Sequence, residues 1–238
     1  MLQTLLMMIM FAANLVQAAF TGQEDKRELS VDAEAVETLD IEAGAGSLDV
    51  IGVTGTGRIV VIATIQVPDA DADEAQQIIE DDLVLNLESD GSRAMLEGYF
   101  RDSRRLFSES PRVNLEVRVP ERLSLGIEDG SGSLEVRNVL GGIELNDGSG
   151  AIRITDSGGL LSIRDGSGSI EIDGAGGDIT IVDGSGSITV AAVDGSVSIE
   201  DGSGSIDARD IAGDLLVPDD GSGSFDYSGV AGRVVKKD

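Results

Sequence analysis

The sequence predicts an all-β protein: a single-stranded parallel β-solenoid (β-helix) with coils of about 18 residues and an irregular N-terminal part that carries one short helix. Three observations predict this fold. The residues Asp-Gly-Ser-Gly recur at intervals of 18, with one interval of 19, starting at Asp129, Asp147, Asp165, Asp183, Asp201 and Asp220. A second glycine follows each Asp by 12 positions. Between these motifs apolar and polar residues alternate, which is typical of β-strands.

Each of the six regular coils, over residues 129–238, is expected to hold two short strands. In the third coil, Ile170, Ile172, Ala175, Ile179 and Ile181 are predicted to point inward. One coil cannot bury its own apolar edge, so the coils must stack about 4.8 Å apart. Glycines are expected at the corners because a residue without Cβ adopts positive φ at no steric cost.

Residues 1–18 are predicted to be an export signal peptide. The apolar run from Leu5 to Val16 is too short to span a bilayer, and Val16-Gln17-Ala18 offers small residues at the usual cleavage offsets. No Lys or Arg precedes the run, which departs from the usual pattern, and a buried helix or strand is the alternative interpretation. The prediction is a mature chain of residues 19–238 that forms a single domain in the periplasm or at the cell surface.

Residues 19–128 are predicted to form the irregular part of this domain. Residues 43–55 match the repeat as a degenerate coil, with Ala43 in place of Asp and with Leu48, Val50 and Val53 inward. Next come a longer strand that ends at Pro68, an acidic helix, a hairpin and an alternating strand that ends at Pro120. These elements are expected at residues 58–67, 71–83, 83–87 with 94–100, and 113–119.

The composition excludes several classes of partner and of stabilising bond. The chain has 44 acidic and 17 basic residues, for a formal net charge of −27. Nucleic acids and anionic membrane surfaces are therefore not expected as partners, since both are bound through Lys and Arg. The charge suits a soluble surface protein. Because the chain has no cysteine, disulfides are excluded, and stability must come from stacking.

The order of these motifs resembles a known family. A degenerate Gly-Ser-Leu-x-Val unit comes first, followed by a strand, helix and hairpin insertion and then by Val117-Arg118-Val119-Pro120 with Leu123 and Leu125. Repeats of Asp-Gly-Ser-Gly-Ser complete the pattern. The chain is similar over nearly all its mature length to the bacterial putative-adhesin family of exported domains of unknown function. The resemblance implies a β-solenoid-like fold and an extracytoplasmic location, and it implies no catalytic residues.

The six repeated aspartates are expected to form a ladder along one exposed edge. The preferred interpretation is that each side chain accepts a hydrogen bond from the backbone N–H two residues on and so shapes the corner. The alternative is a Ca²⁺ ladder along the same edge, as in nonapeptide β-rolls. Those rolls need a further Asp after the glycines, and only Gly174-Ala175-Gly176-Gly177-Asp178 comes close to that pattern. The calcium candidates are Asp129, Asp147, Asp165, Asp183, Asp201 and Asp220.

No enzyme activity and no cofactor are expected. The motif serines have no histidine to act as their base, and the three lysines (Lys26, Lys236 and Lys237) lie near the mature termini. Zinc sites lack His and Cys, and no phosphate-binding Gly-x-x-x-x-Gly-Lys loop is present. A carboxylate pair that cuts polysaccharides would need protruding loops and aromatic platforms, and the coils have no such insertion and only Phe225 and Tyr227 as aromatics.

One segment differs in composition from the rest. Seven basic residues fall between Arg93 and Arg122, with aromatic residues beside them. Arginine and aromatic residues are enriched at interface hot spots, although arginines that pair with the acidic body and aromatics that cap the solenoid are the preferred interpretation. The partner-binding candidates are Tyr99, Phe100, Arg101, Arg104, Arg105 and Phe107.

The sequence therefore predicts a non-enzymatic exported scaffold of the envelope or cell surface, and the resemblance adds an adhesin-like role in the broad sense of that family. The alternative is a binding module whose Arg/aromatic loop, residues 99–112, docks an envelope protein or a glycan.

Overall fold

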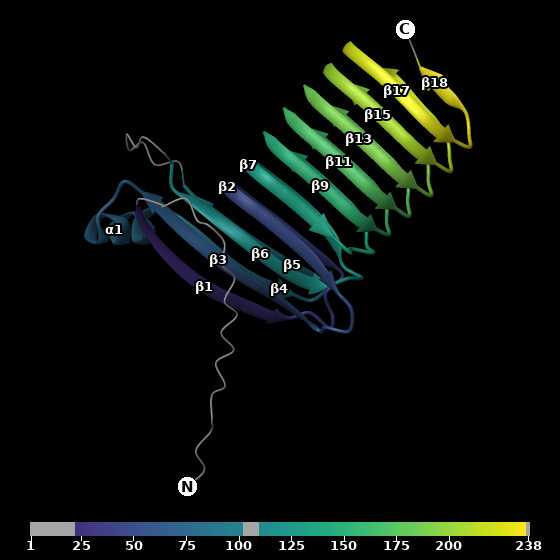
Figure 1. Ribbon diagram of the computed structural model, residues 1–238. Helices are drawn as coiled ribbons and strands as arrows, with labels where there is room; N and C mark the ends of the chain where they lie inside the picture. The colour runs from purple at the N-terminus through teal and green to yellow at the C-terminus, as the bar shows by residue number, and fades with distance from the viewer. Residues whose placement is uncertain (1–21, 102–109, 237–238) are drawn as a thin grey trace, which may run out of the picture.

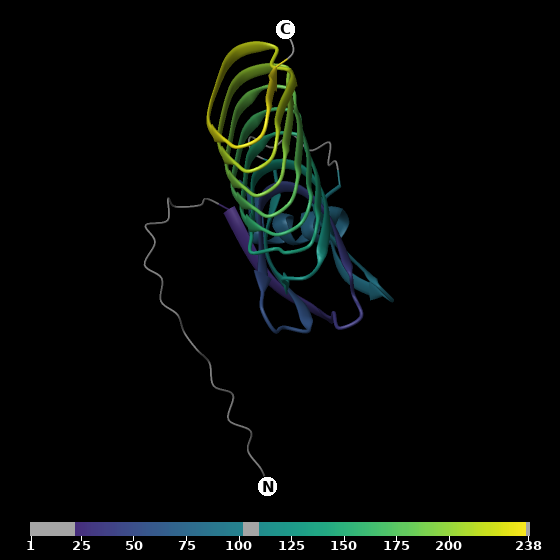
Figure 2. The ribbon, with the colours of Figure 1, turned by 90° about the vertical axis from the view of Figure 1, so that its right-hand side faces the viewer.

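A computed structural model describes residues 22–101 and 110–236 of the chain. In these residues one sheet of 18 strands and one helix form an elongated molecule (Figure 1). The coil stack occupies one end, and the irregular N-terminal part with its helix occupies the other. Seen from a direction turned by 90°, the coils are similar outlines stacked behind one another (Figure 2). The predicted all-β solenoid is confirmed.

Each regular coil contains a longer strand and a shorter one. The longer strands follow the Asp-Gly-Ser-Gly motif and are β9 (Gly150–Ser157), β11 (Gly168–Ala175), β13 (Gly186–Val193), β15 (Ser203–Ile211) and β17 (Ser222–Val230). The shorter strands precede the next motif and are β8 (Ile143–Asp147), β10 (Leu161–Asp165), β12 (Ile179–Asp183), β14 (Val197–Asp201), β16 (Leu215–Asp219) and β18 (Val234–Lys236).

Strands of successive coils pair in parallel at the repeat spacing. Ile172 pairs with Val190 in the longer strands, and Ile163 pairs with Ile181 in the shorter ones. Between β14 and β16 the register shifts, because the last interval is 19 residues rather than 18. The 18-residue coil is therefore the repeating structural unit.

Two long strands each span both sides of a coil. β2 (Thr38–Val53) pairs in parallel with β7 (Ser124–Arg137), and Ala43 lies opposite Asp129. Leu48 and Val50 are buried, as predicted for the degenerate coil. The prediction for Val53 was wrong, since this side chain is only half-buried and Gly52 is the buried residue.

The N-terminal part extends both faces of the solenoid with further strands. On one side β1 (Gly22–Asp32) pairs antiparallel with β3 (Arg58–Pro68), β3 pairs antiparallel with β6 (Arg112–Pro120), and β6 pairs in parallel with β2. On the other side β4 (Leu83–Asp90) and β5 (Arg93–Phe100) form the predicted hairpin, and β5 pairs in parallel with β2. The predicted acidic helix is α1 (Ala72–Asp82), whose N-cap residue Asp71 accepts a hydrogen bond from the Glu74 N–H.

The interior is a continuous aliphatic core that begins at Ala33 and extends to Val217. The predicted inward residues of the third coil are all buried, with exposed fractions of 0–3%. At the C-terminal end, Phe225 and Tyr227 occupy the register positions of Ile206 and Ala208. Their rings stack with centroids 5.3 Å apart, and Phe225 packs against the aliphatic core.

The predicted positive φ is found at the last glycine of the Asp-Gly-Ser-Gly motif in most of the regular coils, such as Gly168, but not at the glycine 12 positions after each Asp. The second glycine of each coil, such as Gly177, does not have positive φ. A Cβ on Gly177 would lie 2.5 Å from the carbonyl oxygen of Gly159, so close stacking of the coils requires glycine there. The last glycine of the Asp-Gly-Ser-Gly motif is required for two reasons. In the third coil this residue is Gly168, which has a φ of +147° and on which a Cβ would lie 1.7 Å from the Gly150 carbonyl oxygen.

Candidate functional site

The repeated aspartates form a ladder at one corner of the solenoid. Asp129, Asp147, Asp165, Asp183 and Asp201 end the shorter strands, or the equivalent part of β7, and successive members are direct register partners. Their exposed fractions are only 2–8%, so the prediction of an exposed edge was wrong. The strand alternation that turns Ile163 inward also turns Asp165 inward, two residues later.

The predicted corner hydrogen bond is present. The backbone N–H of Ser149 donates to Asp147 Oδ1 at 3.2 Å, and the same bond recurs at Asp165, Asp183 and Asp201. The second carboxylate oxygen, Oδ2, is buried in all five aspartates and receives no hydrogen bond. In Asp147, Asp165, Asp183 and Asp201 one carboxylate oxygen therefore shapes the turn, and in all five aspartates Oδ2 is left without a donor.

Burial raises the pKa of every aspartate in this ladder. Desolvation, followed by the charge of Asp147, raises the pKa of Asp129 to about 7. Desolvation, followed by the charge of Asp165, raises the pKa of Asp183 to about 6. The pKa values of Asp147, Asp165 and Asp201 are also raised, chiefly by desolvation, because the N–H groups that favour ionisation only partly compensate.

The sixth predicted member lies outside the ladder. Asp220 forms an ion pair with Lys236 at 2.6 Å, and the corner hydrogen bond is made by Asp219, whose Oδ1 accepts from the Gly221 N–H at 2.9 Å. The extra residue in the last interval accounts for this change. Among residues 22–101 and 110–236, no group of three or more His, Cys, Asp or Glu side chains is placed so that it could hold a metal ion.

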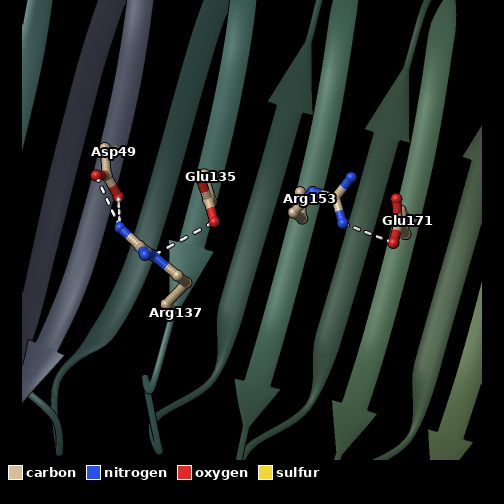
Figure 3. A network of polar contacts seen from close by, with 5 residues as sticks. All are labelled: Asp49, Glu135, Arg137, Arg153 and Glu171. Carbon is tan, nitrogen blue, oxygen red and sulfur yellow. Dashed lines mark hydrogen bonds and ion pairs between the residues drawn. The ribbon is translucent and has the colours of Figure 1, made fainter. Parts of the chain in front are cut away.

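The outer face of the longer strands carries ion pairs that join neighbouring coils. Arg137 on β7 contacts Asp49 on β2 at 2.9 Å and Glu135 at 3.3 Å, and Arg153 on β9 contacts Glu171 on β11 at 2.6 Å (Figure 3). These side chains are partly exposed, so each pair contributes about 0–1 kcal/mol.

The predicted Arg/aromatic loop is described only in part. Tyr99 and Phe100 end β5, and Arg101 follows with its backbone N–H donating to the Asp82 carbonyl at 2.8 Å. Phe100 packs against the main core and against the smaller cluster under α1, which is the contact that capping requires. Arg101 is exposed. Arg104, Arg105 and Phe107 lie outside the described residues.

Other basic residues of this region have structural partners that no sequence signal indicates. The Arg122 guanidinium donates to the carbonyl oxygens of Val36 and Ala33, and so fixes the connection between β1 and β2. Arg112 donates to Gln66 Oε1 at 2.8 Å. The partners in these contacts are separated by between 46 and 89 positions in the sequence, so composition and periodicity do not reveal them.

A shallow polar hollow lies where the regular coils meet the N-terminal part. Its volume is about 570 Å³, and it is formed by β2, β6 and β7. Asn114 is held in it by the Ser47 N–H, which donates to Asn114 Oδ1 at 2.9 Å. Gly44 precedes the lining residue Ala45, and a Cβ on Gly44 would lie 2.8 Å from Tyr99 Cβ; the candidate Tyr99 itself does not line the hollow. The lining residues are Ala45, Gly46, Ser47, Ser110, Arg112, Asn114, Ser131, Gly132 and Ser133.

Within the part of the chain that the structure describes, the only helix is too short and too polar to cross a membrane. No family model matches the sequence, and no curated protein matches it.

Several solved bacterial structures are similar in fold. A putative cell adhesion protein from Clostridium sporogenes is 9% identical, with a TM-score of 0.36, over 90% of this chain and 100% of that chain. A putative adhesin from Bacteroides fragilis is 12% identical, with a TM-score of 0.42, over 91% and 99%. A putative lipid binding protein from Parabacteroides distasonis is 13% identical, with a TM-score of 0.36, over 91% and 99%. The chain thus resembles proteins described as putative adhesins, and at these scores we transfer no site or ligand from them.

Proposed function

We propose that the chain is a non-enzymatic, exported β-solenoid that serves as a scaffold of the cell envelope or surface, with an adhesin-like role. The observation that carries the proposal is the parallel stack itself, which continues through the longer strands from β2 to β17. Each coil pairs with the coils on both sides, so the stack resists bending and holds its two ends apart. Such a body suits a spacer or a display surface.

The charge of the chain supports the same proposal. A formal net charge of −27 keeps copies of the protein apart and favours solubility outside the cell. The outward positions of the longer strands carry serine, threonine and charged residues, as Ser169, Glu171 and Thr189 illustrate. These side chains hydrate well, so the body can stand in water without a covering layer.

The second candidate function is a binding module that docks an envelope protein or a glycan through Tyr99, Phe100, Arg101, Arg104, Arg105 and Phe107. The polar hollow favours it, because its lining includes Arg112, Asn114 and four serines, whose polar groups can hydrogen-bond a ligand. Hydroxyl and carboxylate groups of a glycan are suitable partners for such a set. The arginines would add a local positive charge on an otherwise acidic body.

One experiment separates the two functions. Purified mature protein is tested for binding to envelope fragments and to an acidic polysaccharide, as wild type and with Arg101, Arg104 and Arg105 each changed to Glu. The matched control changes Arg153, Arg164 and Arg209 to Glu, since these three arginines lie on the regular coils. Circular dichroism checks that both variants fold.

The scaffold proposal predicts that both triple variants bind as the wild type does. A docking module predicts at least about a tenfold loss for the Arg101, Arg104 and Arg105 variant alone, because rim and hot-spot charges govern such contacts. Fractionation tests the exported location separately: a full-length protein that stays in the cytoplasm would contradict both functions.

A further inference from the structure

The aspartate ladder places ionisable groups in a dry row along the solenoid. Asp129, Asp147, Asp165, Asp183 and Asp201 are consecutive register partners, so their carboxylates repeat about every 4.8 Å along the stack. Each side chain is more than nine-tenths buried. Five ionised carboxylates at this spacing would repel one another in a medium that screens charge weakly.

The second oxygen of each carboxylate makes the fully ionised state more unfavourable. Oδ2 is buried and accepts no hydrogen bond in any of the five residues. A buried acceptor that has left water without gaining a donor costs free energy, and it costs more when it carries charge. A bound proton removes the charge and supplies the missing donor, because a protonated carboxyl can donate to the carboxylate of the next rung.

No basic side chain among the described residues neutralises the ladder. On the same strands, the flanking Glu128, Arg164 and Glu200 are exposed on the outer face, and Asn146 and Val182 occupy the equivalent positions of the other rungs. At the N-terminal end of the ladder, the residue in register with Asp129 is the uncharged Ala43. At the other end lie Asp219 and Asp220, whose charges add repulsion at Asp201, while Lys236 pairs with Asp220.

We propose that the five aspartates form a proton-sharing ladder that takes up protons on folding, so that the solenoid becomes more stable as the pH falls from about 8 to about 5. Between successive rungs, a protonated Oδ2 donates to the unprotonated oxygen of its neighbour. The ladder thereby makes the stability of the scaffold respond to the acidity around it, a property separate from any ligand that the scaffold binds.

The direction of this pH dependence follows from the difference in aspartate pKa between the folded and the unfolded chain. The folded pKa values of Asp129 and Asp183 are about 7 and about 6, whereas an aspartate in the unfolded chain titrates near 3.8. Between these values the folded state binds more protons than the unfolded state. The resulting stabilisation is full below the unfolded pKa and is lost as the pH rises through the folded pKa.

The test compares melting temperatures across this pH range, in constant salt with a chelator. We expect the wild-type melting temperature to rise by about 5–10 °C from about pH 8 to about pH 5. In a variant with Asp147→Asn, Asp165→Asn and Asp183→Asn, the side-chain oxygen that the serine N–H needs is kept and the charges are removed. Stacked Asn amides also hydrogen-bond along a ladder. We expect this variant to melt higher than the wild type at pH 8 and to lose at least about half of the pH slope.

A matched control is needed because acid also neutralises surface carboxylates on a chain with a net charge of −27. Asp156→Asn, Asp173→Asn and Asp194→Asn remove three exposed carboxylates from the same three coils. We expect this control to keep the wild-type slope. Equal slopes in the wild type and both variants would overturn the proposal.

Two measurements on the wild-type protein keep the proposal testable even if the ladder variant fails to fold. An infrared band of protonated carboxyl groups in the folded protein should titrate between about pH 5 and about pH 8. Its absence at about pH 5.5 would overturn the proposal. A rise in melting temperature at pH 8 with millimolar calcium, but not with magnesium, would also overturn it, because a metal ion would then occupy the ladder.

Discussion

At the scale of single residues, each coil is shaped by contacts between equivalent atoms of its neighbours. Isoleucine side chains fill the interior. Glycines, which have no side chain, let the backbones of neighbouring coils approach closely. Gly168 shows the second effect, because its φ of +147° and the 1.7 Å approach of a would-be Cβ to the Gly150 oxygen both exclude a side chain. Repetition of this glycine through the stack follows from geometry.

Replacing Gly168 by alanine should therefore strongly destabilise the folded protein. We expect a loss of at least about 3 kcal/mol in the free energy of unfolding, measured with urea, because both strain and overlap with backbone atoms must be relieved. Gly91→Ala is the control, since Gly91 has a φ of +59° and no atom within 4 Å of the added Cβ. It should cost only about 1 kcal/mol. Similar losses in the two variants would contradict the stacking constraint.

A second residue-scale prediction tests the inward and outward positions of one strand. Ile181 is fully buried and Thr180, beside it on β12, is exposed. Ile181→Asp places an unpaired charge in the aliphatic core and should destabilise by about 3–5 kcal/mol, whereas Thr180→Asp should cost under about 1 kcal/mol. The measurement is the urea midpoint at pH 8, and reversed effects would show that the two faces are misassigned.

At the scale of elements, a left-handed residue makes a corner at the C-terminal end of each longer strand. Asn138, Asp156, Ala192 and Asp210 have φ values of 53–57°, nine positions after their Asp. This residue interrupts the period of two and lets the next residue, such as Val193, point inward again. β2 has no such residue at Gly52, so its alternation continues and leaves Val53 half-buried.

The positive φ of Ala192 predicts that a substitution by glycine, which usually destabilises a strand, stabilises the protein at this corner. Ala192→Gly should stabilise the protein by about 0.5–1 kcal/mol, because glycine adopts positive φ without the steric cost that alanine has. Ala191→Gly, one residue earlier in the extended strand β13, should destabilise it by a similar amount. Thermal unfolding of both variants measures the difference, and a loss of stability in both would be inconsistent with a strained corner.

These elements show which features the sequence could predict. The coils, the hairpin and α1 follow from periodicity and from Pro68 and Gly91, because local patterns determine them. The corner at Ala192 could not be found, since alanine gives no sign of positive φ. The burial of Asp165 was missed because charge favours an exposed position, and strand alternation overrides that preference. The hollow at Asn114 depends on contacts between β2 and β6, which no short motif encodes.

At the scale of the whole molecule, one aliphatic core joins the irregular part and the coils. The N-terminal part is therefore continuous with the solenoid, and Phe225 packs against the core in the last described coil. An elongated body of this kind is what the proposed scaffold requires.

The proposed exported location gives a prediction for the whole chain. The mature protein should begin at Ala19, because the apolar run and the Val16-Gln17-Ala18 offsets fit signal cleavage. N-terminal sequencing of the protein recovered outside the cytoplasm tests this, and a retained Met1 would contradict it.

The central claim is that the 18-residue coil is the unit from which the molecule is built. Excision of residues 165–182 removes one whole coil and places Asp183 after Arg164, so Asp147 should stack directly on Asp183. We predict a cooperatively folded protein that X-ray scattering shows to be shorter by about 4.8 Å. Excision of residues 165–173 alone removes most of β11 and part of the corner, and it should prevent a continuous stack. Failure of the whole-coil excision to fold, or an unchanged length, would contradict the account.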